Sequence, residues 1–535
     1  VSRSRLLATL YNGSQLLYDV IIKQEFLPKE IGGDYGFPQR TVLSECERVD
    51  AENVDNVVSL GDANIPFIYE KESVGYGNRI VPNLKWSTDL ANGKRVRSYL
   101  TELALLMRTK VLLENGDMAK TRLVWFYPLS MKVGTVRKMA ETWAKIFEEV
   151  FGVAPNEDNL IQMPESVAPY YFYKGSSTFR GAASTVASID IGGGSSDVVV
   201  FGSNAQQPAL LTSFRFAANV LFGDGFSEIP HGDTNPMLVK YVDYFKRLFD
   251  SDDDRYGELN GILDDIAAKG KSEDINAFLF SVINNKVVNG NDVFSYNLRL
   301  NEDGHRKIIF IYFYVAMVYY VACMMKRSDI EKPRSVMFSG TGSKVLGIVG
   351  SQRDLDQLTQ VVFERVYGET YDADGFSVIM EKKEPKQITC RGALMQVRNT
   401  VGCTQVTTLN RLMDDFDSTL KQNFSMIGKE RLCYDDMDSD TVRQELVDKV
   451  REFNRFFVQL CEDIHVVDRF LVENRSLQRF KEVVDKDLGH YLINGWNFVN
   501  KNQEDRNGSD VIEDAVFFYP IIGSIRDNLI ENLKE

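Results

Sequence analysis

Cysteine and histidine are scarce in this chain, and their scarcity limits the chemistry available to it. Only six cysteines and four histidines occur among 535 residues. The cysteines stand singly, without the paired spacing of a zinc site, at Cys46, Cys323, Cys390, Cys403, Cys433 and Cys461. The histidines show no metal-ligand spacing either, at His231, His305, His465 and His490. We therefore expect no site built on a transition metal or a reactive thiol, and free thiols in a reducing, cytoplasmic compartment.

The chain also lacks an excess of positive charge. It has 62 lysines and arginines against 76 aspartates and glutamates, for a formal net charge of −14. Such a charge disfavours non-specific binding to nucleic acid or anionic lipid, so we expect neither a nucleic-acid nor a membrane partner. Hydrophobic residues make up 44% of the chain, which argues against widespread disorder. A chain of this length ordinarily folds as two or more domains.

A single long run without charge covers residues 308–325 and is long enough to cross a membrane. Six of its residues are tyrosine or phenylalanine, and it leads toward a second apolar run at Ser335–Phe338. A helix that is apolar on all sides is expected at the centre of a large α/β lobe. The run therefore predicts a buried core helix, with a transmembrane helix as the alternative.

The most informative segment is the octapeptide Asp190–Asp197, which lies between the apolar runs 186–189 and 198–201. This pattern predicts two strands joined by a glycine-rich loop. Glycines allow the backbone amides of such a loop to converge on phosphate oxygens, and the flanking aspartates could hold Mg²⁺ or its waters. The candidate phosphate-binding residues are Gly192, Gly193, Gly194, Ser195 and Ser196, and the candidate metal ligands are Asp190 and Asp197. An ordinary hairpin turn is the alternative for the same residues.

Three further segments accompany this loop in order along the chain. A predicted strand at Leu123–Pro128 and a predicted helix over 136–150 precede the segment Ile161–Ala168, which contains Glu165. The run Ser335–Phe338 leads into Ser339–Lys344, a glycine-containing turn between a strand and a helix. Small residues in Cys390–Leu394 would allow a helix there to pack closely.

Taken together, these segments resemble the motifs of the actin-like ATPase superfamily, which includes actin, the heat-shock chaperone ATPases and sugar kinases. The triple glycine is most similar to the chaperone branch, and the resemblance covers roughly residues 40–400. It implies a two-lobed α/β fold with duplicated mixed sheets flanked by helices. We expect a first lobe over 1–200 with a small strand-rich subdomain at 42–90, and a second lobe over 201–400 with an outer subdomain at 230–305.

The resemblance also implies a function, which is slow Mg²⁺-dependent ATP hydrolysis that opens and closes the lobes and couples nucleotide state to a protein partner. Glu165 would orient the attacking water, and Asp190 would act beside it through the metal or its waters. Asp197 would hold the metal shell, and the loop 192–196 would bind the phosphates. Adenosine would be bracketed by Gly340, Thr341, Gly342 and Ser343. A nucleotide-binding scaffold without turnover and a small-molecule kinase are the alternatives, and self-assembly remains open.

One motif of the family is missing from its expected place. The family opens with a strand and a first phosphate loop, but the only similar letters, Asp34-Tyr35-Gly36, follow no apolar strand and precede no phosphate cradle. Lys85 lies where the chaperone branch has a phosphate-reaching lysine, although a solvated lysine explains it as well. The missing loop favours the scaffold alternative.

Residues 401–535 differ in character from the rest of the chain. They contain 17 lysines and arginines against 26 aspartates and glutamates, a net charge of −9. Apolar residues at spacings of three and four from Val442 to Leu471 predict one long amphipathic helix. We expect an acidic helical appendage whose apolar stripe forms its own core or, alternatively, docks a partner protein. No β-rich peptide-binding pattern follows, so a peptide chaperone is doubtful.

Overall fold

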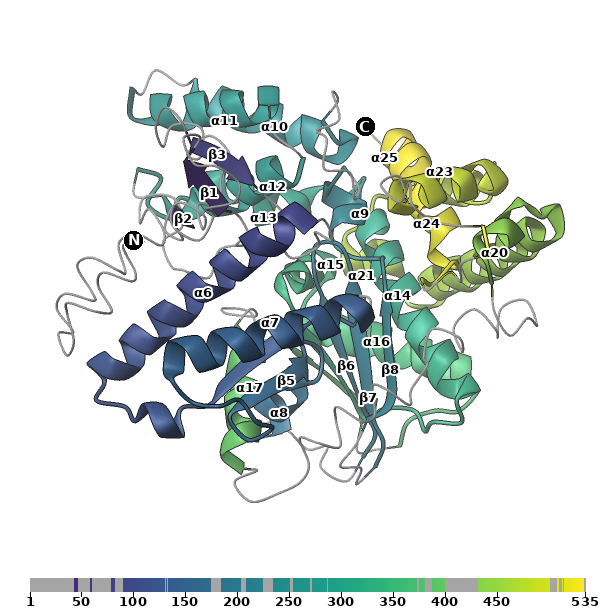
Figure 1. Cartoon of the computed structure of the whole chain (residues 1–535). Helices are drawn as coiled ribbons and strands as arrows, with labels where there is room; N and C mark the ends of the chain where they lie inside the picture. Colours follow the sequence, from purple (N-terminus) through teal and green to yellow (C-terminus); the bar gives the residue numbers. More distant parts are fainter. Residues whose placement is uncertain are drawn as a thin grey trace.

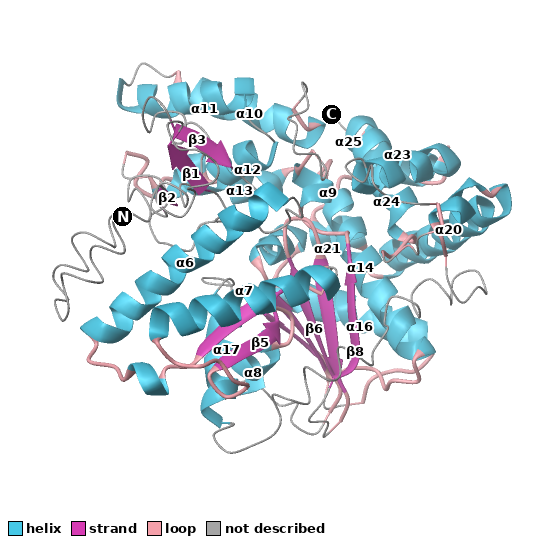
Figure 2. Cartoon of the chain, in the orientation of Figure 1, coloured by secondary structure: helices cyan, strands magenta, loops and turns pink. Residues whose placement is uncertain are grey.

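The computed structural model describes residues 43–46, 58–59, 78–81, 90–129, 131, 133–174, 184–203, 208–224, 234–250, 254–269, 272–285, 287–372, 375–380, 387–399, 432–500, 508–509, 512 and 514–533. Within these ranges a central five-stranded sheet is surrounded by helices, and two smaller sheets accompany it (Figures 1 and 2). Asp34–Gly36 and Lys85 lie outside the described residues.

The central sheet has the strand order β10-β9-β6-β7-β8. Strands β6, β9 and β10 are parallel, and β7 is antiparallel to both of its neighbours. The strands are β6 (Val186–Ile191), β7 (Ser196–Phe201), β8 (Pro208–Phe214), β9 (Ser335–Ser339) and β10 (Ser377–Met380). The boundary expected between the two lobes at residue 200 falls within this sheet. Strands β6 and β7 pair with β9 and β8, which come after that boundary.

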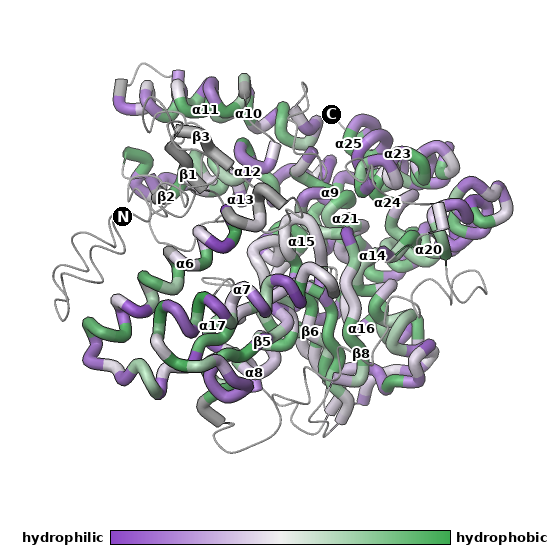
Figure 3. Tube along the Cα trace, in the orientation of Figure 1, coloured by the Kyte–Doolittle hydropathy of each residue, from purple (hydrophilic) through white to green (hydrophobic). Residues whose placement is uncertain are grey.

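Both faces of the sheet are buried, which explains why β6, β7 and β9 are almost continuously apolar. Side chains alternate between the faces. One face packs into the core that contains α14 (Lys307–Arg327) and α16 (Gln352–Tyr367). The other face packs against α8 (Ala168–Lys174) and α17 (Gln387–Asn399). In Figure 3 the strands and α14 are mainly hydrophobic.

Helix α14 is the charge-free run of the sequence. It is long and apolar enough to cross a membrane, but 89% of its most apolar window is buried inside the protein. Its neighbours are the sheet on one side and C-terminal helices on another. The prediction of a core helix is confirmed.

The part of the chain before residue 175 builds a separate parallel pair, β4 (Leu123–Tyr127) and β5 (Leu160–Pro164). Helices α6 (Leu90–Leu113) and α7 (Val133–Phe151) pack together beside it, around a core that includes Trp143. The predicted strand at Leu123–Pro128 and the predicted helix over 136–150 are confirmed. A three-stranded antiparallel sheet lies within the expected subdomain 42–90 and consists of β1 (Leu43–Cys46), β2 (Val58–Ser59) and β3 (Asn78–Val81).

The segment between β8 and β9 is helical. Its helices before α14 are α9 (Asn219–Phe222), α10 (Pro236–Phe249), α11 (Gly257–Lys269), α12 (Ser272–Ser281) and α13 (Tyr296–Glu302). After β9 the chain forms the short helices η9 (Thr341–Val345) and α15 (Leu346–Val349). The remaining short turns of helix are η5 (Met118–Lys120), η6 (Asp254–Tyr256), η7 (Val282–Asn284), η8 (Asp292–Phe294) and η10 (Tyr434–Asp438).

The C-terminal region is helical, as predicted, but the single long helix from Val442 to Leu471 is wrong. Helix α20 (Asp440–Asp463) ends before His465, whose φ of 54° breaks the helix, and α21 (Val466–Phe470) follows. The apolar spacing continues across the break, so periodicity alone could not reveal it. The later helices are α22 (Asn474–Val483), α23 (Leu488–Asn500), α24 (Phe518–Ser524), the π-helix η11 (Ile525–Leu529) and α25 (Ile530–Asn532).

These helices share one hydrophobic core with the sheet and α14. The Tyr312 ring lies 5.3 Å from the Phe453 ring and 5.0 Å from the Phe457 ring, centroid to centroid. The Tyr312 hydroxyl donates a 2.6 Å hydrogen bond to Asn454 Oδ1. The apolar stripe of α20 is therefore buried against α14, which leaves it neither a separate bundle core nor a free docking face. Figure 1 shows α20, α23, α24 and α25 grouped at the upper right, on the side away from α6 and α7.

Candidate nucleotide site

The glycine-rich loop is a tight hairpin between β6 and β7. The Gly192 amide donates to the Ser195 carbonyl at 2.9 Å, and Ile191 pairs with Ser196. The far side of the loop is held by the start of α9, where the amides of Ala218 and Asn219 donate to the carbonyls of Gly192 and Gly193 at 3.3 and 2.8 Å. Its backbone is thus fixed from both sides, and Gly193 remains exposed at its tip.

The carboxylate of Asp190 is tied to the neighbouring parallel strand. Asp190 pairs with Ser339 in the register of β6 and β9, and the Ser339 hydroxyl donates to Asp190 Oδ2 at 2.7 Å. Ser339 directly precedes the second glycine-containing turn. The loop that begins at Asp190 and the turn that begins at Gly340 therefore start side by side at the carboxyl ends of two parallel strands, which is where open α/β sheets bind ligands.

Asp197 is buried, with 4% of its surface exposed. Its Oδ1 accepts a hydrogen bond from the Ser213 hydroxyl at 2.5 Å, and its Oδ2 accepts one from the Leu129 amide at 3.0 Å. The pKa of this carboxyl group is raised to about 7, mainly by burial; the two hydrogen bonds lower it and the negative charges of Glu165 and Asp190 raise it. Because both oxygens accept from protein donors, the arrangement differs from that of a direct metal ligand.

Glu165 follows β5, and its amide donates to the Tyr127 carbonyl at 3.0 Å. It is half-buried. Its charge acts on Asp197 together with that of Asp190, so the three predicted acidic residues lie within electrostatic range of one another. They come from two different sheets: Glu165 from the edge of the β4–β5 pair, and the two aspartates from the central sheet.

The second turn is packed directly onto the first. Gly340 has a φ of 81°, and a Cβ placed on it would lie 2.4 Å from the Ile191 carbonyl oxygen. A Cβ on Gly342 would lie 2.4 Å from the Gly192 carbonyl oxygen. Backbone atoms of the glycine hairpin therefore occupy the space beside Gly340 and Gly342. The adenosine role of residues 340–343 stays a prediction.

The hydroxyl groups of the two loops differ in where they point. Ser196 is fully buried and donates to the Phe216 carbonyl at 2.7 Å, so its hydroxyl is committed to the interior. Ser343 is buried and donates to the Gly340 carbonyl at 2.7 Å, which closes the second turn. Ser195 and Thr341 are half-buried. Of the predicted phosphate hydroxyls, the structure turns Ser196 away from the loop surface.

A cavity of about 610 Å³ adjoins the second turn. Its wall is formed in part by Asn301, Lys307, Ser343, Lys344, Gly347 and Arg469. The Lys307 ammonium donates to Asn301 Oδ1 at 2.8 Å, and Arg469 Nε donates to Asp354 Oδ1 at 2.9 Å. Burial lowers the pKa of Lys344. The cavity therefore joins the second turn to a residue of α21, from the C-terminal region.

Several residues of the site carried no recognisable signal in the sequence. Ser213, Leu129 and Asn219 hold the carboxylate or the loop through contacts between distant segments. Ser339 could have been found, because it precedes the glycine turn at the same strand end as Asp190. Among the described residues, no group of three or more His, Cys, Asp or Glu side chains is placed to hold a metal ion. The Mg²⁺ site stays a prediction.

Comparisons with known proteins gave likenesses only among solved structures. No family model matches the chain, and no curated protein matches it. It is similar to the crystal structure of MreB5 of Spiroplasma citri bound to ADP, with 12% identity, a TM-score of 0.31, and 68% of this chain and 91% of that chain covered. It is also similar to a non-polymerising mutant of MamK bound to AMPPNP, with 12% identity, a TM-score of 0.32, and coverage of 67% and 91%.

The strand order of the central sheet is that of a mixed sheet, as the sequence analysis predicts. A hairpin of antiparallel strands continues into two parallel strands on its other side, and both glycine-containing turns leave that sheet at one edge. The chaperone branch stays a prediction. The chain has an α/β fold built on a mixed five-stranded sheet, with an additional helical region at its C-terminal end, and membership of the actin-like ATPase superfamily stays a prediction.

Proposed function

We propose that this chain binds an adenine nucleotide at the edge of the central sheet and hydrolyses it slowly as a molecular switch. The observation that carries the proposal is the convergence of Glu165, Asp190 and Asp197 beside a fixed glycine hairpin. Three acidic side chains within electrostatic range of one another, beside a loop rich in backbone amides, suit a polarised water or a hydrated cation. A nucleotide with its Mg²⁺ would supply that cation.

In this proposal the parts of the site have separate tasks. The amides of residues 192–195 would bind phosphate oxygens, and Glu165 would orient the attacking water, since phosphoryl transfer depends on positioning and electrostatics. Asp190 would act on the waters around the metal. Asp197 would hold the strands and the loop of the site in place from the protein interior, because its oxygens already accept hydrogen bonds from Ser213 and Leu129.

The adenosine would lie against the outer surface of the second turn, beside the cavity near Lys344 and Gly347. Bound Mg²⁺ would neutralise charge on the phosphates.

The switch would act through the contacts between the two sheets. Asp197 joins the central sheet to the loop after β4, and α17 packs closely on α8 next to the same strands. A ligand bound between the two sheets would change how they close across these contacts. A protein partner, which could be a second copy of this chain, would recognise that change in how the sheets close.

A nucleotide-binding scaffold without turnover is the second candidate. The observation that favours it is the inward hydroxyl of Ser196, which removes one predicted phosphate contact. Binding would then persist while hydrolysis is absent.

The test is calorimetric titration of Mg-ATP into the full chain, followed by phosphate release under the same conditions. Asp190→Asn removes the charge but keeps an acceptor for Ser339, and Asp158→Ala at an exposed turn is the matched control. Binding that weakens only in Asp190→Asn, with slow phosphate release, supports the switch. Binding without release supports the scaffold, and no binding of ATP or ADP contradicts both.

A further inference from the structure

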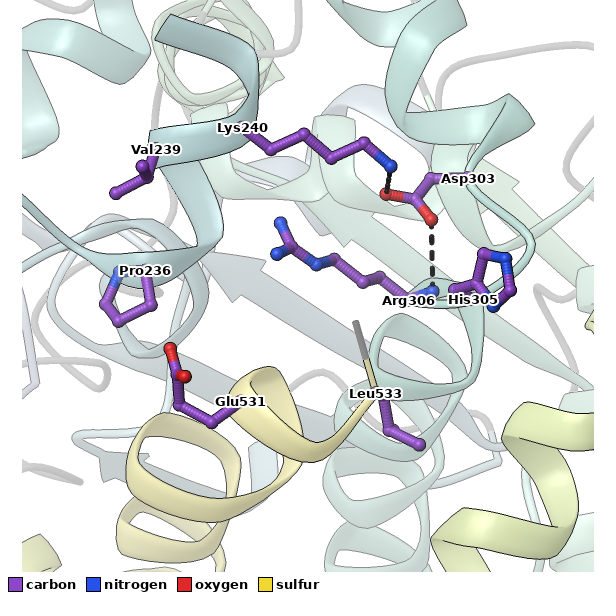
Figure 4. Close-up of a pocket in the computed structure, with 8 residues that line it drawn as sticks. All are labelled: Pro236, Val239, Lys240, Asp303, His305, Arg306, Glu531 and Leu533. Atoms are coloured by element: carbon purple, nitrogen blue, oxygen red, sulfur yellow. Dashed lines mark hydrogen bonds and ion pairs between the residues drawn. The ribbon is translucent and has the colours of Figure 1, made fainter. Parts of the chain in front are cut away.

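A second cavity, of about 400 Å³, lies away from the proposed nucleotide site (Figure 4). It is bordered by α10, the turn before α14, and α25 with the residue that follows it near the C-terminal end of the described chain. None of its lining residues belongs to the glycine loops or the three-carboxylate cluster. Those lining residues are Pro236, Val239, Lys240, Asp303, His305, Arg306, Glu531 and Leu533.

Arg306 is the unusual residue in this cavity. Only 6% of its surface is exposed, and its guanidinium donates a 3.1 Å hydrogen bond from Nη1 to the Met237 carbonyl. Among the described residues it has no ion pair with a carboxylate. Figure 4 shows the guanidinium extending into the cavity between Lys240 and Glu531. A buried guanidinium stays charged and has five N–H donors, so it is costly to leave without an anion.

The charges of Lys240 and Asp303 already compensate each other. The Lys240 ammonium lies 3.4 Å from Asp303 Oδ2, and the Tyr241 hydroxyl donates to the same oxygen at 2.8 Å. Asp303 Oδ1 accepts the backbone amide of Arg306 at 3.3 Å. Asp303 is therefore engaged by three donors and neutralises Lys240, which leaves the guanidinium of Arg306 as the positive group facing the cavity.

The chemistry of the walls limits what this group would bind. A guanidinium fork matches a carboxylate with two parallel hydrogen bonds. The carboxylates of Asp303 and Glu531 on the same walls disfavour a dianion such as phosphate. Pro236, Val239 and Leu533 supply apolar surface, and the cavity is at the small end of the size range of ligand sites.

We propose that this cavity is a binding site for a small monocarboxylate with a compact apolar body, whose carboxylate pairs with Arg306. The ligand would touch α10 and α25 at once, and so would link the outer helices of the second lobe to the C-terminal helices. The site does not depend on nucleotide binding, because it shares no residue with that site.

The experiment is calorimetric titration of the full chain with benzoate and hexanoate as probes, with benzamide and inorganic phosphate in parallel. We expect both carboxylates to bind, and benzamide, which has the shape of benzoate without its charge, to bind at least about tenfold more weakly. Arg306→Gln should weaken benzoate by a similar factor. Arg247→Gln, on the exposed side of the same α10, is the matched control and should leave binding unchanged.

A second variant keeps the test decisive if Arg306→Gln fails to fold. Val239 lines the cavity and is 45% exposed, so Val239→Trp would fill the cavity from its rim without disturbing the core, and it should abolish benzoate binding. Asp190→Asn should bind benzoate like the unmodified chain, which separates this site from the nucleotide site. The proposal is overturned if neither carboxylate binds, if benzamide binds as well as benzoate, if phosphate binds more tightly, or if benzoate binding survives Val239→Trp.

Discussion

The hydroxyl of Ser339 donates a 2.7 Å hydrogen bond to the carboxylate of Asp190, and this contact joins the two loops of the proposed nucleotide site. The two residues are also partners in the β6–β9 register. A change in the position of one loop is therefore transmitted to the other through a short, half-buried contact. Nucleotide affinity should depend on a serine that itself touches no ligand.

Ser339→Ala tests that dependence. Loss of one hydrogen bond to a charged acceptor should raise the dissociation constant for Mg-ATP by about fivefold to tenfold, because Asp190 is no longer held in one orientation. Titration calorimetry measures this dissociation constant. Ser335→Ala on the same strand, whose hydroxyl contacts Ser377 away from the loops, is the control. Equal affinities for the two variants would show that Ser339 has no part in the site.

Gly340→Ala should destabilise the protein strongly. The residue has a φ of 81°, and its Cβ would meet the Ile191 carbonyl oxygen at 2.4 Å, so both the backbone conformation and the packing oppose a side chain. We expect a loss of about 3 kcal/mol in the free energy of unfolding, measured by denaturant titration. Gly347→Ala is the control, because no atom lies within 4 Å of the added methyl group and alanine favours a helix. A fully stable Gly340→Ala would contradict the described packing of the two turns.

The strands and loops of the site were predictable because their signals are local. Three glycines between two apolar runs indicate a hairpin at Asp190–Asp197, and the structure has one. Alternation along β7 would also have placed Ser196 on the same buried face as Val198 and Val200, and Asp197 on the opposite face. The inward hydroxyl of Ser196 was therefore readable from the sequence, although the motif resemblance directed attention to its phosphate role.

Other features depend on contacts between distant segments, and no local pattern reports them. The Leu129 amide donates to Asp197, which lies 68 positions later in the sequence. Gly340, which packs on Ile191, follows Ser339, and Ser339 lies 149 positions after its partner Asp190. The end of α20 before His465 depends on one residue with a positive φ inside a continuous apolar pattern. The burial of the α20 stripe against α14 required knowing which helix lies beside it.

Asp197 should make stability depend on pH. Burial raises its pKa to about 7, above the ordinary value of 3.8, so the folded protein binds a proton that the unfolded chain releases between those two values. Its favourable contribution is fully present below about pH 4 and is lost as the pH rises through about 7. Asp197→Asn should remove this loss. The free energy of unfolding of the variant, relative to that of the unmodified chain, should therefore be higher at pH 8 than at pH 5.5. Urea titrations at both pH values measure the difference, and an unchanged pH profile would contradict the buried, protonated state.

The packing of α17 on α8 should be sensitive to one methyl group. A Cβ on Gly392 would lie 1.9 Å from the Ala168 carbonyl oxygen, so Gly392→Ala would force the two helices apart. We expect a loss of about 2–3 kcal/mol in stability and a weaker nucleotide response, because these helices lie beside both sheets. Gly489→Ala on α23, with no atom within 4 Å of the new methyl group, is the matched control. Thermal unfolding of both variants decides the point, and equal melting temperatures would contradict the close contact.

The C-terminal helices should prove inseparable from the second lobe. Phe457 is fully buried, and its ring lies 5.0 Å from the Tyr312 ring of α14. Phe457→Ala would leave a cavity in the core that the two regions share, at a cost of about 3–5 kcal/mol. Leu394→Ala, at a residue that is 55% exposed, should cost little and serves as the control. If the region were an independent appendage, Phe457→Ala would produce a second unfolding transition at low denaturant while the β6–β9 core stayed intact. A single transition shifted to lower denaturant, followed by both tryptophan fluorescence and circular dichroism, is the result expected from one continuous core.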